Sequence, residues 1–112
     1  MTDRLKFRIP YYKNLEFDGF EFVDYNIKGA SAGLMSTGVP RVPEQCTGLK
    51  DKKGKLIYEA DLLRHHGDEI LECVFIDGKF QLKIGDEYFD IIGTERIVGN
   101  IHANHELLKG QK

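Results

Sequence analysis

The dipeptide Asp77-Gly78, set between two runs of strand-forming residues, constrains the fold of this chain more than any other feature. Asp-Gly favours a two-residue hairpin turn because both central positions need a positive φ. After the turn, Phe80, Leu82 and Ile84 alternate with polar residues, which is the period of a strand with one wet face. This region is therefore predicted to be an antiparallel hairpin.

A third strand extends this hairpin into a meander. The predicted strands are 70–76, 79–84 and 87–92, with a second turn at Gly85-Asp86. The first strand is apolar on both faces, so it is expected at the centre of a sheet. A further strand is predicted from Arg96 to Ile101. The residues expected to be largely buried lie on the apolar phase of these strands: Phe75, Phe80, Leu82, Ile84, Ile92, Val98 and Ile101.

The N-terminal part predicts a strand and a second hairpin. Apolar residues alternate with basic ones over residues 4–9, so one strand face is expected to be wet and basic, formed by Arg4, Lys6 and Arg8. Pro10 is expected to end this strand because it cannot donate to a ladder. Asp18-Gly19 predicts a hairpin turn between residues 15–17 and 20–22.

Residues 29–43 are rich in small residues, Gly and Pro, which excludes a helix or a central strand. They are interpreted as a surface loop, with a lid or a partner-binding arm as the alternative. Leu56 to Leu63 is expected to be a strand or an irregular entry into the meander. Near the C-terminus, Asn104 is predicted to cap a short helical turn that reaches Leu108.

A chain of 112 residues fits one domain. The expected divisions are an N-terminal strand and hairpin (1–28), the loop (29–44) and a β-barrel core (45–108). Its 16 basic and 18 acidic residues give a net charge of -2, which weakens any general argument for nucleic-acid binding. The charged start and the lack of a long apolar run predict a cytoplasmic protein without a signal peptide or membrane contact.

Candidate catalytic and metal-ligating residues are scattered. Zinc could draw on the histidines and cysteines, but these lack the usual ligand spacing: His65, His66, His102, His105, Cys46 and Cys73. The carboxylate pairs Glu59 with Asp61 and Asp86 with Glu87 are the only acid–base candidates, and carboxylates beside turns are normally solvated. The chain is predicted to have no catalytic residues, metal or cofactor.

The basic run of residues 50–55 is a stronger candidate for a binding feature than the scattered residues above are for catalysis or metal binding. Its simplest interpretation is a solvated β-turn from Asp51 to Gly54, with Gly54 at positive φ. The alternative is a phosphate-contacting loop, reinforced by the basic face of the N-terminal strand. The candidate interaction surface therefore comprises Lys50, Lys52, Lys53 and Lys55 together with Arg4, Lys6 and Arg8.

Two longer motifs resemble those of the YopX family. Residues 45–61, QCTGLKDKKGKLIYEAD, resemble its Q-x-T-G-L-K-D-K-x-G-K-x-I-Y-E-G-D signature, and residues 98–108 resemble its closing I-G-N-I-[YH]-x-N-P-E-L-L. Lys6-Phe7-Arg8 resembles its K-F-R start. Ala60 replaces the usual Gly of the first motif, so this position is expected not to require a positive φ.

The resemblance implies a phage- or prophage-encoded protein whose family has no established biochemical role. It also implies an SH3-like β-barrel for the C-terminal part, with the N-terminal strand and hairpin packed on it. The leading hypothesis is a non-enzymatic binding or adaptor module that meets a protein partner through a strand edge or through residues 29–43. The alternative is a nucleic-acid-binding protein that uses the lysine turn and the basic strand face. Self-association stays open.

Overall fold

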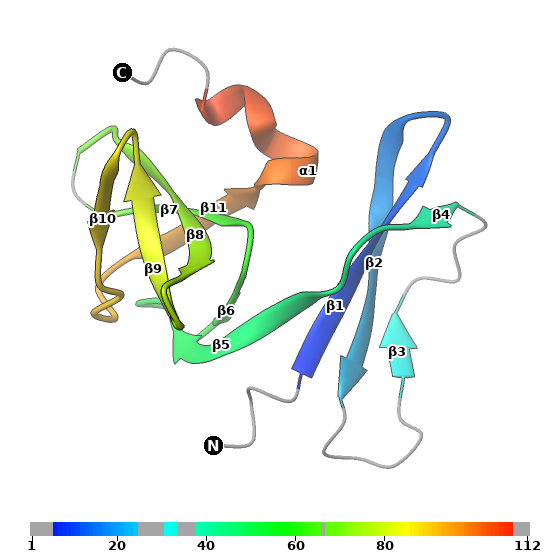
Figure 1. The fold of residues 1–112 in the computed structure, drawn as a ribbon, viewed down its shortest axis with the longest axis horizontal. Helices are drawn as coiled ribbons and strands as arrows, with labels where there is room; N and C mark the ends of the chain where they lie inside the picture. The colour runs from blue at the N-terminus through cyan, green and yellow to red at the C-terminus, as the bar shows by residue number, and fades with distance from the viewer. Residues whose placement is uncertain (1–5, 25–30, 34–37, 66, 109–112) are drawn as a thin grey trace.

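The computed structural model describes residues 6–24, 31–33, 38–65 and 67–108. Over these residues the chain is mostly β, as predicted, and its curled sheets form a half-barrel (Figure 1). The strands fall into an N-terminal sheet and a C-terminal sheet. The chain passes from the first sheet to the second between Tyr58 and Asp61.

The N-terminal sheet has the strand order β3-β2-β1-β5-β6, with β4 paired to β1. All its described pairings are antiparallel. The strands are β1 (Lys6–Lys13), β2 (Glu16–Asp24), β3 (Ser31–Gly33), β4 (Val39–Pro40), β5 (Glu44–Lys50) and β6 (Leu56–Tyr58).

The C-terminal sheet has the order β10-β9-β8-β7-β11 and contains the predicted meander. Its strands are β7 (Asp61–Arg64), β8 (Ile70–Ile76), β9 (Lys79–Ile84), β10 (Glu87–Phe89) and β11 (Arg96–Asn100). The first two strands of the meander have their predicted bounds, and β8 lies inside the sheet. The third strand ends at Phe89 rather than at residue 92.

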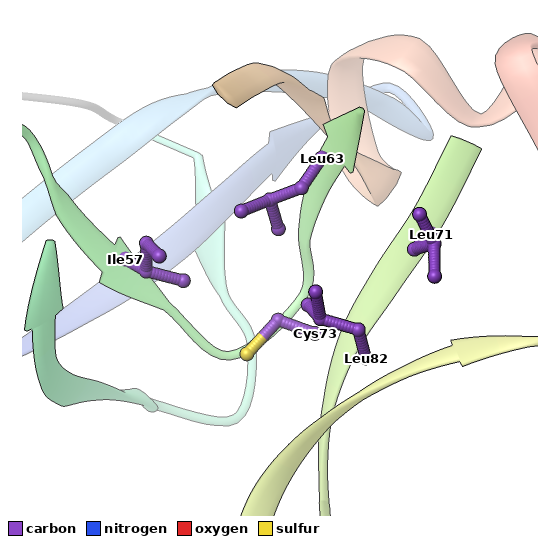
Figure 2. Close-up of a cluster of buried hydrophobic side chains, with 5 residues drawn as sticks. All are labelled: Ile57, Leu63, Leu71, Cys73 and Leu82. Atoms are coloured by element: carbon purple, nitrogen blue, oxygen red, sulfur yellow. The ribbon is translucent and has the colours of Figure 1, made fainter. Parts of the chain in front are cut away.

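The core lies on the concave face of the C-terminal sheet. Figure 2 shows its buried cluster, which comprises Ile57, Leu63, Leu71, Cys73 and Leu82. Leu82 was predicted, but Phe75 and Ile92 are 48% and 63% exposed, so their predicted burial is wrong. Phe75 lies one residue pair from the turn of the β8–β9 hairpin, and Ile92 follows the end of β10. Among the described residues, β7 pairs with β8 only at residues 70–72, so Phe75 has β9 alone as a neighbouring strand.

The remaining predicted core residues are half-buried: Phe80, Ile84, Val98 and Ile101.

The first hairpin turns at Asn14-Leu15, and the prediction of a turn at Asp18-Gly19 is wrong. Asn14 and Leu15 have φ values of 53° and 68°, as both central positions of this turn class require. Gly19 instead lies inside β2, opposite Tyr11, next to a register shift at which β2 has one residue more than β1. Pairing of the two strands on both sides of this shift outweighed the local turn preference of Asp-Gly.

Pro10 does not end β1, which contradicts the prediction. β5 pairs with β1 only at Phe7 and Arg8, and β4 pairs with it only at Tyr11 and Tyr12. Pro10 lies between these two pairings, where a missing N–H removes no ladder bond. Its carbonyl accepts from Arg41 N at 2.8 Å.

Ala60 lies in the tight turn between β6 and β7 with φ 76°, so the expectation of an ordinary backbone here is wrong. Its N–H donates to the Cys73 carbonyl at 2.8 Å, and its carbonyl accepts from Ile101 N at 3.0 Å. These two bonds hold the left-handed conformation, which costs a residue with a Cβ about 1–2 kcal/mol.

The C-terminal helix α1 (Ile101–Asn104) begins one turn earlier than predicted, and a 3₁₀ turn follows at His105–Leu108. Asn100 is the N-cap, because its Oδ1 accepts from His102 N and Ala103 N, each at 3.0 Å. The Asn104 side chain accepts from Asn100 N at 3.2 Å instead of capping a helix. In the described part of the chain, no helix is long and apolar enough to cross a membrane.

Within the predicted loop 29–43, residues 31–33 form the edge strand β3 and residues 39–40 form β4. Neither is a central strand, as the composition predicted. Residues 29, 30 and 34–37 lie outside the described residues, and the lid or arm interpretation stays a prediction.

Candidate functional site

Arg8 is the centre of a buried set of charged side chains, so its predicted place on a wet strand face is wrong. The residue is 5% exposed. Its Nε donates to Glu44 Oε1 and its Nη1 to Asp61 Oδ1, both at 2.8 Å. Its Nη2 donates to the Glu59 carbonyl at 3.1 Å. The alternation along β1 was correctly recognised, but Arg8 lies inside because the carboxylates of Glu44 and Asp61 offset its charge.

The other members of that predicted face are Lys6 and Arg4. Lys6 is half-buried, and Arg4 lies outside the described residues.

Glu44 continues the set to His102 and Tyr12. Its Oε2 lies 2.5 Å from His102 Nε2, and His102 Nδ1 lies 2.5 Å from Tyr12 Oη. Because an ionised carboxylate can only accept, we assign a proton to Nε2, which then donates to Glu44. The imidazole also stacks on Phe17, with ring centroids 5.5 Å apart and planes 23° apart.

The resulting chain, Tyr12–His102–Glu44–Arg8–Asp61, is called the buried polar chain. Its residues come from β1, α1, β5 and β7, so it joins the N-terminal sheet to the C-terminal sheet. The second Asp61 oxygen accepts from Tyr58 N at 2.8 Å. Burial raises the pKa of Asp61, although the Arg8 charge opposes that shift. These hydrogen bonds orient every side chain of the buried polar chain, which therefore connects the two sheets in a fixed arrangement.

Tyr12 and His102 also line a hollow of about 650 Å³. The Arg41 guanidinium lies 4.2 Å from the centroid of the Tyr12 ring. Burial raises the pKa of Tyr12, and the nearby Arg41 charge only partly opposes it. The Tyr12 hydroxyl is therefore a neutral hydrogen-bond donor at neutral pH rather than an activated nucleophile.

On the other side of Arg8 lies a groove of about 690 Å³, here called the lysine–aromatic groove. Its apolar wall is Phe20, Phe22, Leu56 and Tyr58, its basic rim is Lys50 and Lys55, and β11 closes the far side through Ile97–Asn100. Phe22 is 42% exposed, and its ring centroid is 5.9 Å from that of Tyr58. Arg8 and Asp61 also line the groove, so the groove and the buried polar chain share two residues.

The lysine turn forms as predicted, with Gly54 at φ 84° and its N–H donating to the Asp51 carbonyl at 2.9 Å. Asp51 Oδ1 accepts from the N–H groups of Lys53 and Lys55 at 2.9 Å, and Oδ2 accepts from Ile97 N at 3.1 Å. Burial disfavours the Asp51 carboxylate, but these backbone donors and the Lys55 charge lower its pKa overall. The turn is therefore held rigidly against β11.

All four lysines of the turn are exposed, but only two of them line the groove. Lys50 and Lys55 lie on its rim, whereas Lys52 and Lys53 do not line it. The backbone N–H of Lys52 donates to the Glu95 carbonyl at 2.8 Å, which ties this side of the turn to the segment before β11.

The zinc candidates lie in separate places. His102 belongs to the buried polar chain, His65 Nε2 is 2.7 Å from Thr94 Oγ1, and His105 is exposed. Cys46 and Cys73 are buried and form no disulfide, and His66 lies outside the described residues. In the described ranges no three His, Cys, Asp or Glu side chains gather as metal ligands would.

The two carboxylate pairs that were candidates for acid–base chemistry have different surroundings. Asp61 and the Glu59 carbonyl both accept from Arg8, whereas Asp86 and Glu87 are exposed at a turn. Tyr12 and Glu44 were missed by sequence reasoning. Neither lies in a motif, and their partner His102 is 90 and 58 residues away in the chain.

Two curled sheets, a buried polar chain between them and a surface groove define a small β module. Comparison with protein families shows to which family the chain belongs. The family described as YopX protein matches residues 9–109, and the chain belongs to this family.

A solved structure supports the fold. The chain is similar to the crystal structure of protein EF1440 from Enterococcus faecalis, with 25% identity and a TM-score of 0.56. The likeness covers 93% of this chain and 97% of that one. The comparison with curated proteins found no match.

Proposed function

We propose that this chain is a non-enzymatic binding module of a phage or prophage that acts in the bacterial cytoplasm and holds a protein partner in the lysine–aromatic groove. The observation that carries the proposal is the groove itself, which combines the exposed ring of Phe22 with the charges of Lys50 and Lys55. The resemblance of two long motifs to the YopX family supports a phage or prophage origin.

The chemistry of the groove favours an extended segment with acidic residues around an apolar anchor. The exposed Phe22 ring offers contact area to an apolar side chain, and aromatic residues commonly anchor interfaces. Lys50 and Lys55 complement carboxylates at the rim. The charge of Arg8 is offset by Glu44 and Asp61, so the rim lysines supply the net positive field.

Single-stranded nucleic acid fits the groove less well. Such ligands stack successive bases on several aromatic rings in a basic channel. Here Tyr58 is 9% exposed, and the Arg8 guanidinium lies 4.2 Å from the Phe20 ring centroid and covers it. Of the three aromatic rings that line the groove, only Phe22 is exposed. The net charge of -2 also opposes binding to phosphates.

The geometry of the buried polar chain supports a non-enzymatic role. A general base needs a free nitrogen within reach of substrate. Both ring nitrogens of His102 are occupied, one by Glu44 and the other by Tyr12. The raised pKa of Tyr12 likewise favours a neutral hydroxyl.

Affinity capture from infected or lysogenic cells tests the proposal when groove variants are compared with a matched control. Phe22→Ala and Lys55→Glu should each lose the captured partner. Lys53→Glu makes the same charge change in the same turn but does not line the groove, so it should retain the partner. Equal capture by all three variants would show that the groove is not the binding site.

The nucleic-acid alternative rests on the four exposed lysines and is tested directly. Fluorescence anisotropy with a single-stranded and a duplex oligonucleotide at physiological salt should show binding no tighter than a Kd of about 10⁻⁴ to 10⁻⁶ M. Sequence-dependent binding below micromolar, lost when Lys52, Lys53 and Lys55 are replaced together by Glu, would reverse the order of the two hypotheses.

A further inference from the structure

We propose that strand β10 is a docking edge for an extended basic segment of another protein, which inserts one apolar side chain into the cavity beside Phe89. This surface lies on the C-terminal sheet and does not depend on the lysine–aromatic groove. It would give the chain a second binding site with the opposite charge preference.

The backbone of β10 offers the edge. β10 lies at one end of its sheet and pairs there only with β9 (Figure 1). Glu87 and Ile84 flank a two-residue turn, so they exchange both main-chain hydrogen bonds. Alternation along the ladder then directs the N–H and C=O of Tyr88 away from β9. Among the described residues, these two groups have no hydrogen-bond partner.

A cavity of about 400 Å³ lies beside this edge. Phe89 is directly opposite Leu82 in the ladder, so its side chain shares the concave face with the core. Leu71 and Leu82 line the cavity at 7% and 1% exposure, whereas Phe89 and Ile92 line it at 46% and 63%. A free strand edge next to an apolar pocket is the combination that strand-addition complexes use.

The charges around the cavity select a basic occupant. Glu69, Asp90 and Glu95 line it, and no Lys or Arg does. The Glu95 carboxylate is occupied by the N–H groups of Ile92 and Gly93 at 2.9 Å, but Glu69 and Asp90 are exposed.

The exposed residues Asp86 and Glu87 of the β9–β10 hairpin add negative charge next to the edge. The exposed pair of Asp90 with Lys79, at 3.4 Å, offsets little of this charge. Lys or Arg side chains flanking an apolar anchor are therefore the complementary pattern. A second copy of the chain docked edge to edge would instead bring two acidic rims together.

The probe is a fluorescent hexapeptide, Lys-Val-Lys-Phe-Lys-Val, titrated against the full chain by anisotropy at physiological salt. Two matched peptides separate the contributions. An N-methylated version keeps the charges and side chains but cannot pair with a strand edge, and a version with Glu in place of Lys reverses the charge. We expect saturable binding of the first peptide and at least about tenfold weaker binding of the other two.

Variants of the edge complete the test. Tyr88→Pro removes the outward N–H without breaking the ladder to β9 and should weaken binding about tenfold or more, whereas Tyr88→Thr keeps the N–H and should retain most of it. If Tyr88→Pro does not fold, Ile92→Lys places a repelling charge at the exposed rim and should weaken binding similarly.

Phe22→Ala alters the lysine–aromatic groove and should leave binding of the hexapeptide unchanged. No binding at millimolar peptide, or equal binding of the N-methylated peptide, would overturn the proposal. Self-association in sedimentation that Tyr88→Pro abolishes would assign the edge to a second copy of the chain and would also overturn it.

Discussion

Replacing Arg8 with Met tests whether the buried polar chain holds the two sheets together. Met keeps most of the side-chain volume but removes both ion pairs, the Nε bond to Glu44 and the Nη1 bond to Asp61. These carboxylates are 7% and 3% exposed as residues, so each would be left buried without its charged partner. Breaking one buried pair in this way costs about 3–5 kcal/mol, so a loss of at least about 3 kcal/mol is expected.

That loss is a large share of the total stability, because a natural domain has about 5–15 kcal/mol. It corresponds to a fall in the unfolding temperature of about 10 °C or more. Urea unfolding followed by circular dichroism measures it, with an unchanged slope as the sign that the folded state is intact.

Two controls separate lost charge pairing from lost packing. Lys13→Met also replaces a basic side chain with Met, at an exposed position of the same strand, and should change stability by less than about 0.5 kcal/mol. Combining Arg8→Met with Glu44→Gln and Asp61→Asn removes the stranded charges and should recover part of the loss. A cost below about 1 kcal/mol for Arg8→Met alone would refute the reasoning.

Three other predictions test separate features. Asp51→Asn should lower the stability at neutral pH but change it little at low pH. The pKa of Asp51 is lowered in the folded state, so the carboxylate stabilises the fold above its unfolded pKa of about 3.9, and this contribution is lost as the pH falls through the folded pKa. Thermal melts at pH 7 and pH 2 measure the difference. Gly99→Ala should destabilise by about 1–3 kcal/mol, since a Cβ would lie 2.3 Å from Asn104 Oδ1, and denaturant unfolding measures this. Leu82→Ala should cost about 2–5 kcal/mol in the same assay, and the half-exposed Phe75→Ala should cost clearly less.

Local pattern was enough to predict the C-terminal meander and the lysine turn. Both depend on neighbours in the chain: Asp77-Gly78 between apolar runs for the first, and Asp51 to Gly54 for the second. Turn chemistry and strand alternation act within a few residues, so they can be recognised without knowing the fold. The same alternation placed Leu82 correctly in the core.

The predictions failed where distant segments decide the outcome. Asp18-Gly19 has the local chemistry of a turn, but pairing of β1 with β2 on both sides of Gly19 moved the turn to Asn14-Leu15. Ala60 keeps a positive φ because hydrogen bonds to Cys73 and Ile101 hold it there. A local preference of about 1–2 kcal/mol yields to several tertiary contacts acting together.

The candidate sites show the same division. The sequence by itself determined a mostly β chain with an exposed lysine turn, and its motifs pointed to the YopX family. Only the tertiary structure decided that Arg8 lies inside, because its partners Glu44 and Asp61 are 36 and 53 residues away. A charged side chain avoids burial unless carboxylates are brought to it, and only the folded arrangement of both sheets brings them.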